Sequence, residues 1–96
     1  MALYMICYDL NKQKNYPALY EAIKNVGTDW CRVVDSTWFV ITHHGSVAIR
    51  DHLRRAADSD DSLFVVHITT PAPAAWIGLS DEVNTWLKSR LERINY

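Results

Sequence analysis

An apolar run near the start of the chain, Leu3 to Tyr8, constrains the fold more than any other stretch. Large apolar side chains at successive positions are typical of a strand that is buried on both faces, in the middle of a sheet. Asp9 follows the run and precedes a polar stretch, so we expect the strand to leave the core there. A carboxylate at the end of a rigid strand is well placed to hold a metal ion or a polar ligand. Asp9 is therefore the first candidate for chemistry.

The rest of the chain shows helical and strand patterns in turn. Pro17 favours the first turn of a helix, and Gly27 is expected to stop that helix. Asp35-Ser36 reads as the turn of a hairpin, while Ser46 and Ser80 are expected to cap two later helices. The predicted strands are residues 3–9, 30–34, 37–42 and 63–68, and the predicted helices are 17–26, 46–57 and 80–94.

This order of elements predicts the fold class. Strand, helix, two strands, helix and strand make up the ferredoxin-like βαββαβ sandwich, an α+β fold with a four-stranded antiparallel sheet. Right-handed crossovers place both crossover helices on one face of that sheet. We expect a single domain over residues 1–96, with the βαββαβ core in 1–70, a loop at 71–79 and an extra C-terminal helix at 80–94.

The second face of the sheet also needs a cover. The strands at 3–9 and 63–68 are apolar on both faces, and an exposed apolar face of several hundred Å² favours aggregation. The terminal helix, a second protomer or both must cover it. Four Trp and five Tyr are more than a core of this size usually absorbs, so we expect a homodimer.

Composition limits the partners. The net charge of −1 argues against tight, indiscriminate nucleic-acid binding by the whole surface, although a local basic face remains open. Cys7 and Cys31 lack metal-site spacing and are expected to be buried reduced thiols. The first apolar run is too short to span a membrane, and no positive region precedes it, so we expect a cytoplasmic protein with no membrane partner.

Other polar groups each have two interpretations. His43 and His44 can supply a general base or form a polar turn. Asp58, Asp60 and Asp61 resemble a fragment of a calcium loop but lack its Gly and distal Glu, which favours a solvated turn. The basic residues either line one phosphate-binding surface or only solvate helix faces; they are Lys12, Lys14, Lys24, Arg32, Arg50, Arg54 and Arg55.

Three short segments carry a resemblance to known proteins: Tyr8-Asp9-Leu10-Asn11, Asp35-Ser36-Thr37-Trp38 and Gly78-Leu79-Ser80-Asp81-Glu82. In this order they resemble the short prokaryotic proteins of the SinR family over nearly the whole chain. Residues 1–70 also resemble the small CRISPR-associated proteins that pair with the integrase during spacer acquisition. The chain differs from the latter because it ends in a helix rather than a fifth strand and has no strongly basic balance.

The resemblance implies a ferredoxin-like homodimer in which one Asp from each protomer faces a shared cleft. Some CRISPR-associated members are described as Mg²⁺-dependent nucleases and others as non-catalytic DNA-binding scaffolds, and virulence-associated D-type toxins of the same fold cut RNA. By position Asp9 matches the Asp of the metal site. Ser36 or Thr37 matches a small hydroxyl residue at the start of the third strand.

These observations lead to one functional hypothesis and one alternative. The hypothesis is a Mg²⁺- or Mn²⁺-dependent nuclease acting on RNA or DNA, with Asp9 as metal ligand and Asp9 and Ser36 as catalytic residues. The residues expected to bind the ligand are Asn11, Lys12, Arg32, Thr37 and Arg50. In the alternative, Asp9 only caps its own loop. The alternative function is a non-catalytic dimer that uses the same surface as a scaffold or binding module for nucleic acid, nucleotide or a protein partner.

Overall fold

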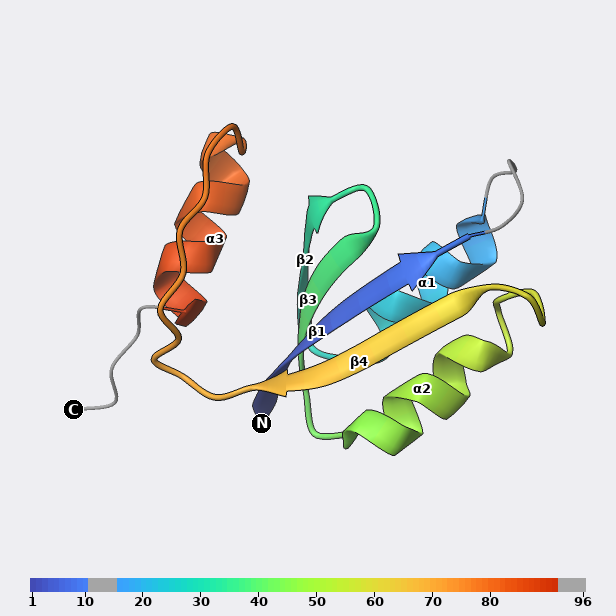
Figure 1. The fold of residues 1–96 in the computed structure, drawn as a ribbon. Helices are drawn as coiled ribbons and strands as arrows, with labels where there is room; N and C mark the ends of the chain where they lie inside the picture. The colour runs from blue at the N-terminus through green and yellow to red at the C-terminus, as the bar shows by residue number, and fades with distance from the viewer. Residues whose placement is uncertain (11–15, 92–96) are drawn as a thin grey trace.

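The computed structural model describes residues 1–10 and 16–91. In chain order its elements are β1 (Ala2–Asp9), α1 (Pro17–Asn25), β2 (Asp29–Val34), β3 (Thr37–Thr42), α2 (Ser46–Arg54), β4 (Ser62–Ile68) and α3 (Asp81–Leu91) (Figure 1). This order confirms the ferredoxin-like α+β class with an extra C-terminal helix. Each predicted strand and helix is present; within the described residues their ends differ from the predicted ones by at most a few residues, and the predicted end of the last helix at 94 lies outside the described residues.

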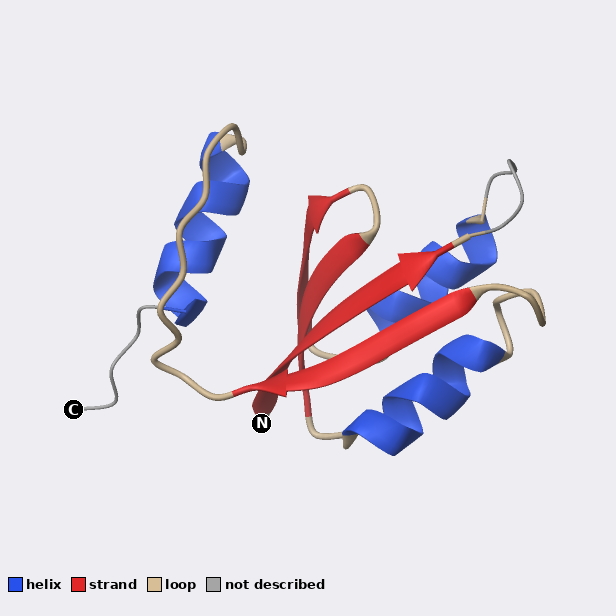
Figure 2. Cartoon of the chain, in the orientation of Figure 1, coloured by secondary structure: helices blue, strands red, loops and turns tan. Residues whose placement is uncertain are grey.

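Strand β1 lies inside a four-stranded antiparallel sheet of order β2-β3-β1-β4. It pairs with β3, where Met5 lies opposite Phe39, and with β4, where Met5 lies opposite Val66. Helices α1 and α2 lie on one side of this sheet and α3 on the other (Figure 2). The apolar run at 3–8 is therefore buried on the face toward α1 and α2 and only partly covered on the face toward α3, where Leu3 is buried but Met5 and Cys7 are half-buried.

The main core lies between the sheet and the pair α1 and α2. Because side chains alternate along a strand, every second residue of β1 and β3 points toward these helices. Trp38 is only 1% exposed and is the largest fully buried side chain. The buried members of this core are Tyr4, Ile6, Tyr8, Tyr16, Leu19, Ile23, Val26, Trp38, Val40, Ile49 and Leu53.

A second, smaller core lies under α3. Leu87 and Leu91 of α3 pack against Leu3 and Phe39 of the sheet, and the half-buried Trp86 joins them. Trp76, in the loop before α3, packs there too, and its Nε1 donates a 2.8 Å hydrogen bond to Asn84 Oδ1. Three of the four Trp side chains thus find a place inside the chain, so the abundance of Trp does not by itself require a partner.

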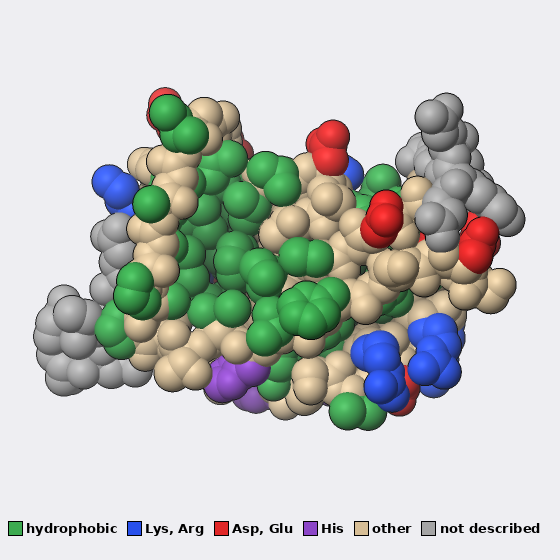
Figure 3. Space-filling view, in the orientation of Figure 1, with side chains coloured by type: hydrophobic (Ala, Val, Ile, Leu, Met, Phe, Trp, Pro, Cys, Tyr) green, Lys and Arg blue, Asp and Glu red, His purple; other side chains and the backbone are tan. Residues whose placement is uncertain are grey.

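Helix α3 leaves part of its sheet face open. Among the elements it packs most against β2, while β4 lies at the opposite edge of the sheet. Phe64 of β4, opposite Cys7, is 59% exposed. Figure 3 shows apolar side chains gathered between the α3 segment and the strands β1 and β4. We call the row formed by the exposed Phe64 and the partly buried Met5, Cys7 and Val66 the β1–β4 strip.

One carboxylate fastens α3 to the edge strand β2. Asp29 Oδ2 accepts a 3.2 Å hydrogen bond from Trp86 Nε1 and a short one from Arg90. Its Oδ1 accepts a 2.9 Å bond from the backbone N–H of Trp30. Burial alone raises the pKa of Asp29, but these bonds outweigh burial and hold the pKa below its ordinary value. The charged form of Asp29 therefore stabilises the docking of α3.

The helix ends confirm two expectations and correct two others. Pro17 is the first residue of α1, and Ser80 Oγ accepts a 3.3 Å bond from the Val83 N–H at the start of α3. The prediction that Ser46 caps α2 is wrong, because Gly45 holds the cap position and Ser46 is already helical. Gly27 does not end α1 through a left-handed conformation, since only Gly78 has a positive φ among the described residues.

Gly27 is instead required by a close backbone approach. A Cβ at this position would lie 2.2 Å from the carbonyl oxygen of Ile41. The neighbouring N–H of Thr28 donates a 2.9 Å hydrogen bond to the same oxygen, which holds the two segments together. The residue type is thus explained by packing against β3 and not by the end of the helix.

Replacing Gly27 by Ala is expected to lower the free energy of unfolding by about 2 kcal/mol, because a backbone oxygen cannot move aside cheaply. The measurement is chemical denaturation followed by circular dichroism. Gly45→Ala is the matched control, since nothing lies within 4 Å of its added Cβ, and it should cost less than about 1 kcal/mol. Equal stability of the two variants would contradict the assigned clash.

Acid is expected to loosen α3. Because the folded-state pKa of Asp29 is lowered, its stabilisation is complete above the ordinary value of 3.8 and is lost as the pH falls below it. Asp29→Asn should remove about 0.5–1 kcal/mol at pH 7, a range that allows for solvent screening of this partly exposed pair. In this variant the free energy of unfolding should fall less between pH 5 and pH 2 than it does in the wild type. Asp51→Asn, at the exposed pair with Arg50, serves as control and should leave the fall unchanged.

Candidate functional site

Asp9 is the last residue of β1, and its side chain is exposed. It lies opposite Ser62 in the register with β4, on the same face as Cys7 and Phe64. No described residue forms a hydrogen bond or salt bridge with its carboxylate. The end of the strand thus presents Asp9 to solvent at the margin of the β1–β4 strip.

A hollow of about 390 Å³ lies beside Asp9. It brings together three of the predicted site residues, Asp9, Arg32 and Ser36. The complete lining is Tyr8, Asp9, Leu10, Tyr20, Arg32, Asp35 and Ser36. A second hollow of about 240 Å³ adjoins Asp9 near Cys7, Ser62 and Phe64, and its lining is mostly apolar. Asp9 therefore borders a polar hollow and an apolar one.

Arg32 reaches the polar hollow from β2 in a fixed position. Its Nε and Nη2 donate bonds of 3.2 and 2.8 Å to the Asp35 carbonyl oxygen. Its guanidinium carbon lies 4.5 Å from the ring centre of Tyr20 and 5.3 Å from that of Trp38. Nη1 has no hydrogen-bond partner among the described residues. Arg32 is thus positioned by its neighbours, with one donor group left for a ligand.

Tyr8 completes the network under the hairpin turn. Its hydroxyl donates a 2.5 Å bond to the Asp35 carbonyl oxygen and accepts a 3.1 Å bond from Trp38 Nε1. Burial raises the pKa of Tyr8, and the opposing effects of Trp38 and Arg32 do not cancel that rise. Tyr8 therefore stays protonated at neutral pH and acts as a donor that fixes the turn before Ser36.

The other predicted residues lie elsewhere. Thr37 begins β3, and its Oγ1 is 3.6 Å from Cys7 Sγ. Arg50 lies on α2, where it pairs with Asp51 at 3.0 Å, and it lines a different hollow together with Arg54. Asn11 and Lys12 fall outside the described residues. The structure therefore assembles Asp9, Arg32 and Ser36 and does not bring Arg50 to the same hollow.

The histidine and cysteine side chains that the sequence offered as candidates do not line the polar hollow beside Asp9. His44 follows β3, and its N–H donates a 3.1 Å bond to Thr42 Oγ1, which fits a polar turn. Both cysteines are free; Cys31 is buried as expected, and burial raises the pKa of its thiol, whereas Cys7 is only partly buried, so the expectation of a buried thiol is wrong for Cys7. Neither His44 nor Cys31 lines the hollow beside Asp9.

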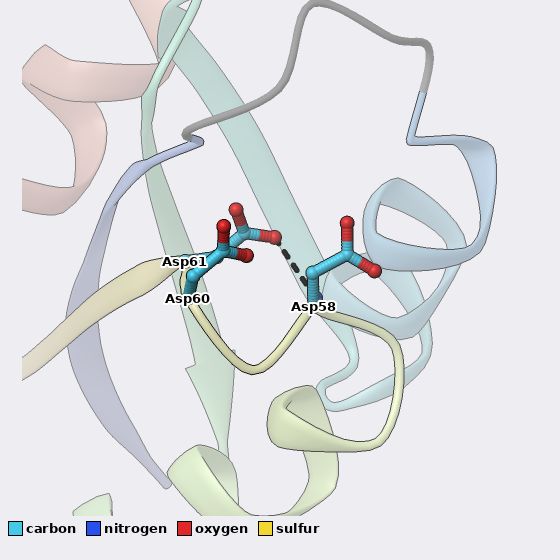
Figure 4. A group of neighbouring side chains, drawn as sticks. All are labelled: Asp58, Asp60 and Asp61. Atoms are coloured by element: carbon cyan, nitrogen blue, oxygen red, sulfur yellow. Dashed lines mark hydrogen bonds between the residues drawn. The ribbon is translucent and has the colours of Figure 1, made fainter.

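The acidic turn after α2 gathers three carboxylates, Asp58, Asp60 and Asp61 (Figure 4). Each offers an oxygen that lies within 4.8 Å of the others, and this is the one group of three such ligands within residues 1–10 and 16–91. Asp61 Oδ2 accepts a 2.9 Å bond from the Asp58 N–H, and Tyr16 donates a 3.5 Å bond to Asp61 Oδ1. These bonds account for the cluster as a turn that joins α2 to β4.

Sequence reasoning missed Tyr8 and Tyr20 as members of the site. Both read as core residues, because each lies in an apolar pattern. Their contact with Arg32 joins β1, α1 and β2, which are distant in sequence, so no local signal reveals it. The position of Tyr8 directly before Asp9 is the only pointer that the sequence offers.

The oxygen atoms beside Asp9 match the ligand type that a hard divalent cation prefers, and the Arg32 guanidinium lines the same hollow. The hollow offers the oxygen atoms of Asp9, Asp35 and Ser36 and no sulfur or imidazole ligand. Mg²⁺ and Mn²⁺ prefer oxygen ligands, and Mg²⁺ is commonly held by one or two carboxylates together with waters and substrate phosphates. Asp9 is therefore the residue that would hold such an ion.

Comparisons with known protein families and with solved structures find no match for this chain. None of the helices in the described part of the chain combines the length and the apolar character needed to cross a membrane.

Proposed function

We propose that the protein is a homodimeric, divalent-metal-dependent nuclease whose active site forms around Asp9. The observation that carries this proposal is the exposed Asp9 carboxylate at the junction of the polar hollow and the β1–β4 strip. The resemblance of the Tyr8–Asn11 and Asp35–Trp38 segments to the SinR and CRISPR-associated proteins supports it. In this proposal Asp9 of each protomer faces the same cleft.

The β1–β4 strip is the surface that we assign to the dimer contact. Phe64 is a large apolar side chain that is 59% exposed on a sheet face, and its neighbours Cys7 and Val66 on that face are apolar as well. Burying such a strip removes apolar area from water at about 25 cal/mol per Å². Asp9 lies two residues after Cys7 on the same face of β1. A twofold axis near Phe64 and Cys7 would therefore bring the Asp9 residues of the two protomers toward each other.

The chain's own residues have separate tasks in this proposal. Asp9 holds the cation, and Arg32 donates its remaining Nη1 group to a phosphate oxygen of the substrate. Ser36, held at the turn by the Tyr8 and Arg32 bonds to Asp35, donates its hydroxyl to the same phosphate. A bound Mg²⁺ or Mn²⁺ supplies Lewis acidity and lowers the pKa of a coordinated water.

The second candidate function is a non-catalytic dimer that binds nucleic acid, nucleotide or a protein partner at this surface. One observation favours it: within residues 1–10 and 16–91 no group of three metal-ligating side chains includes Asp9. Asp9 also lacks a histidine beside it to act as a general base. Activity measurements with and without metal separate the two candidates.

Replacing Asp9 by Asn is expected to lower metal-dependent cleavage by about 100-fold or more, because the variant loses the charged ligand. The assay incubates purified protein with mixed RNA and single-stranded DNA in Mn²⁺, in Mg²⁺ and in EDTA. Asp60→Asn is the matched control, as an exposed carboxylate on the acidic turn, and it should cleave like the wild type. Cleavage that survives Asp9→Asn, or that no protein shows, would refute the nuclease proposal.

Replacing Phe64 by Lys is expected to shift the protein from dimer to monomer, because a charge would have to be buried in the contact. The molecular mass is measured by light scattering over a range of protein concentrations. Val47→Lys is the control, since Val47 is also 59% exposed but lies on α2, on the other side of the sheet. A wild type that stays monomeric at high concentration would rule out the strip as a dimer contact.

A further inference from the structure

We infer that the seam between α1 and β2 binds single-stranded nucleic acid and leads it to the hollow beside Asp9. The α1–β2 seam consists of Tyr20 and Lys24 on α1 and of Trp30 and Arg32 on β2. This inference deepens the proposed function, because it names the class of substrate that the same site would accept. It is carried by the alternation of cationic and aromatic side chains along the seam.

The spacing in the sequence produces this alternation. Tyr20 and Lys24 are four residues apart on a helix and so share a face. Trp30 and Arg32 are two residues apart on a strand and share a face of the sheet. The Lys24 Nζ lies 5.0 Å from the Trp30 ring centre, and the Arg32 guanidinium carbon lies 4.5 Å from that of Tyr20. Each element therefore contributes one aromatic ring and one cation, in opposite order.

The buried Trp38 supports the seam from below. Its ring centre lies 5.4 Å from that of Trp30, 6.1 Å from that of Tyr20 and 5.3 Å from the Arg32 guanidinium carbon. Trp38 itself is 1% exposed, whereas Trp30 above it is 41% exposed. The seam thus presents to solvent the exposed part of the Trp30 indole, with the partly buried cations Lys24 over that ring and Arg32 over the ring of Tyr20.

Nearby acidic groups leave both cations available. Glu21 forms an exposed pair with Lys24 at 3.8 Å, and such pairs on a helix contribute only about 0.3–0.5 kcal/mol. Asp29 lies next to Trp30 but is already bonded to Trp86 and Arg90 of α3. The Arg32 guanidinium bonds to the Asp35 carbonyl oxygen and to the Tyr8 hydroxyl, neither of which neutralises its charge.

The seam is continuous with the candidate site. Tyr20 and Arg32 line the hollow of about 390 Å³ that Asp9 also borders. Two residues along a β-strand, or four along an α-helix, span about 6–7 Å. This length is close to the rise of two stacked bases in a nucleic acid. A base that stacks on Trp30 would displace the Lys24 ammonium from the ring toward a phosphate, and the nucleic acid would then continue past Arg32 toward Asp9.

The chemistry of the seam selects unpaired bases. An aromatic ring stacks on a base only where the face of that base is free, as in a single strand, and such stacking tolerates any base. A duplex covers those faces and presents mainly its phosphates. The net charge of −1 offers the protein as a whole no strong attraction to a duplex.

The experiment measures binding of fluorescein-labelled single-stranded RNA, single-stranded DNA and duplex DNA by fluorescence anisotropy in EDTA. We expect single-stranded RNA and single-stranded DNA both to bind more tightly than the duplex. A difference in affinity between the RNA and the DNA would indicate contacts to the sugar. Trp30→Ala should weaken single-strand binding about tenfold, while Trp30→Phe retains most of it. Lys24→Ala should weaken binding and reduce the slope of log K against log salt by about 0.7.

Two controls keep the result specific. Arg54→Ala removes an exposed cation from α2, outside the seam, and should bind like the wild type. Thermal unfolding of each variant confirms that it is folded. Binding that is unchanged in Trp30→Ala, tighter to the duplex than to the single strands, or absent in the wild type would overturn the inference.

The measurements separate this inference from the proposed function. Binding is followed in EDTA, whereas cleavage requires Mg²⁺ or Mn²⁺. Loss of binding in Trp30→Ala without any cleavage by the wild type would support the seam and refute the nuclease. Cleavage that depends on Asp9 but is unaffected by Trp30→Ala, with unchanged affinity, would support the nuclease and refute the seam.

Discussion

Burial of β1 on both faces is the constraint from which the rest of the structure follows. One face of the strand carries Tyr4, Ile6 and Tyr8 into the core under α1 and α2, and the other carries Leu3 toward α3. A strand so placed must lie inside the sheet, and β1 does, between β3 and β4. Its rigidity fixes the position of Asp9, because the side chain is attached where the pairing with β4 ends.

The hairpin turn belongs to both the fold and the candidate site. The Asp35 carbonyl oxygen accepts bonds from Tyr8 and Arg32, so β1 and β2 hold the same atom. Ser36 and the cation of Arg32 are positioned by these bonds. A change at Tyr8 would consequently disturb the core and the hollow together, and activity losses at such positions have to be read beside stability measurements.

Much of the fold could be predicted from the sequence, because periodicity and order of elements determine the βαββαβ pattern. Asp9 at the end of β1 and the pairing of residues 30–34 with 37–42 followed from local signals. The terminal helix was one of the expected covers of the second sheet face, but the bonds that hold it there could not be foreseen, because they join Asp29 to Trp86 and Arg90 across about sixty positions of sequence. The role of Gly27 was hidden for the same reason, since the atom that excludes a side chain belongs to Ile41.

The partial cover that α3 gives to the sheet links folding to assembly. Helix α3 packs mainly against β2 and also reaches Phe39 of β3 and Leu3 of β1, and the Asp29 carboxylate joins helix and edge strand through hydrogen bonds. A partner bound to the β1–β4 strip would lie next to α3, so any equilibrium that releases this helix enlarges the apolar area available for association. In the proposed dimer, protonation of Asp29 and self-association would be coupled through one surface, and each would shift the equilibrium of the other.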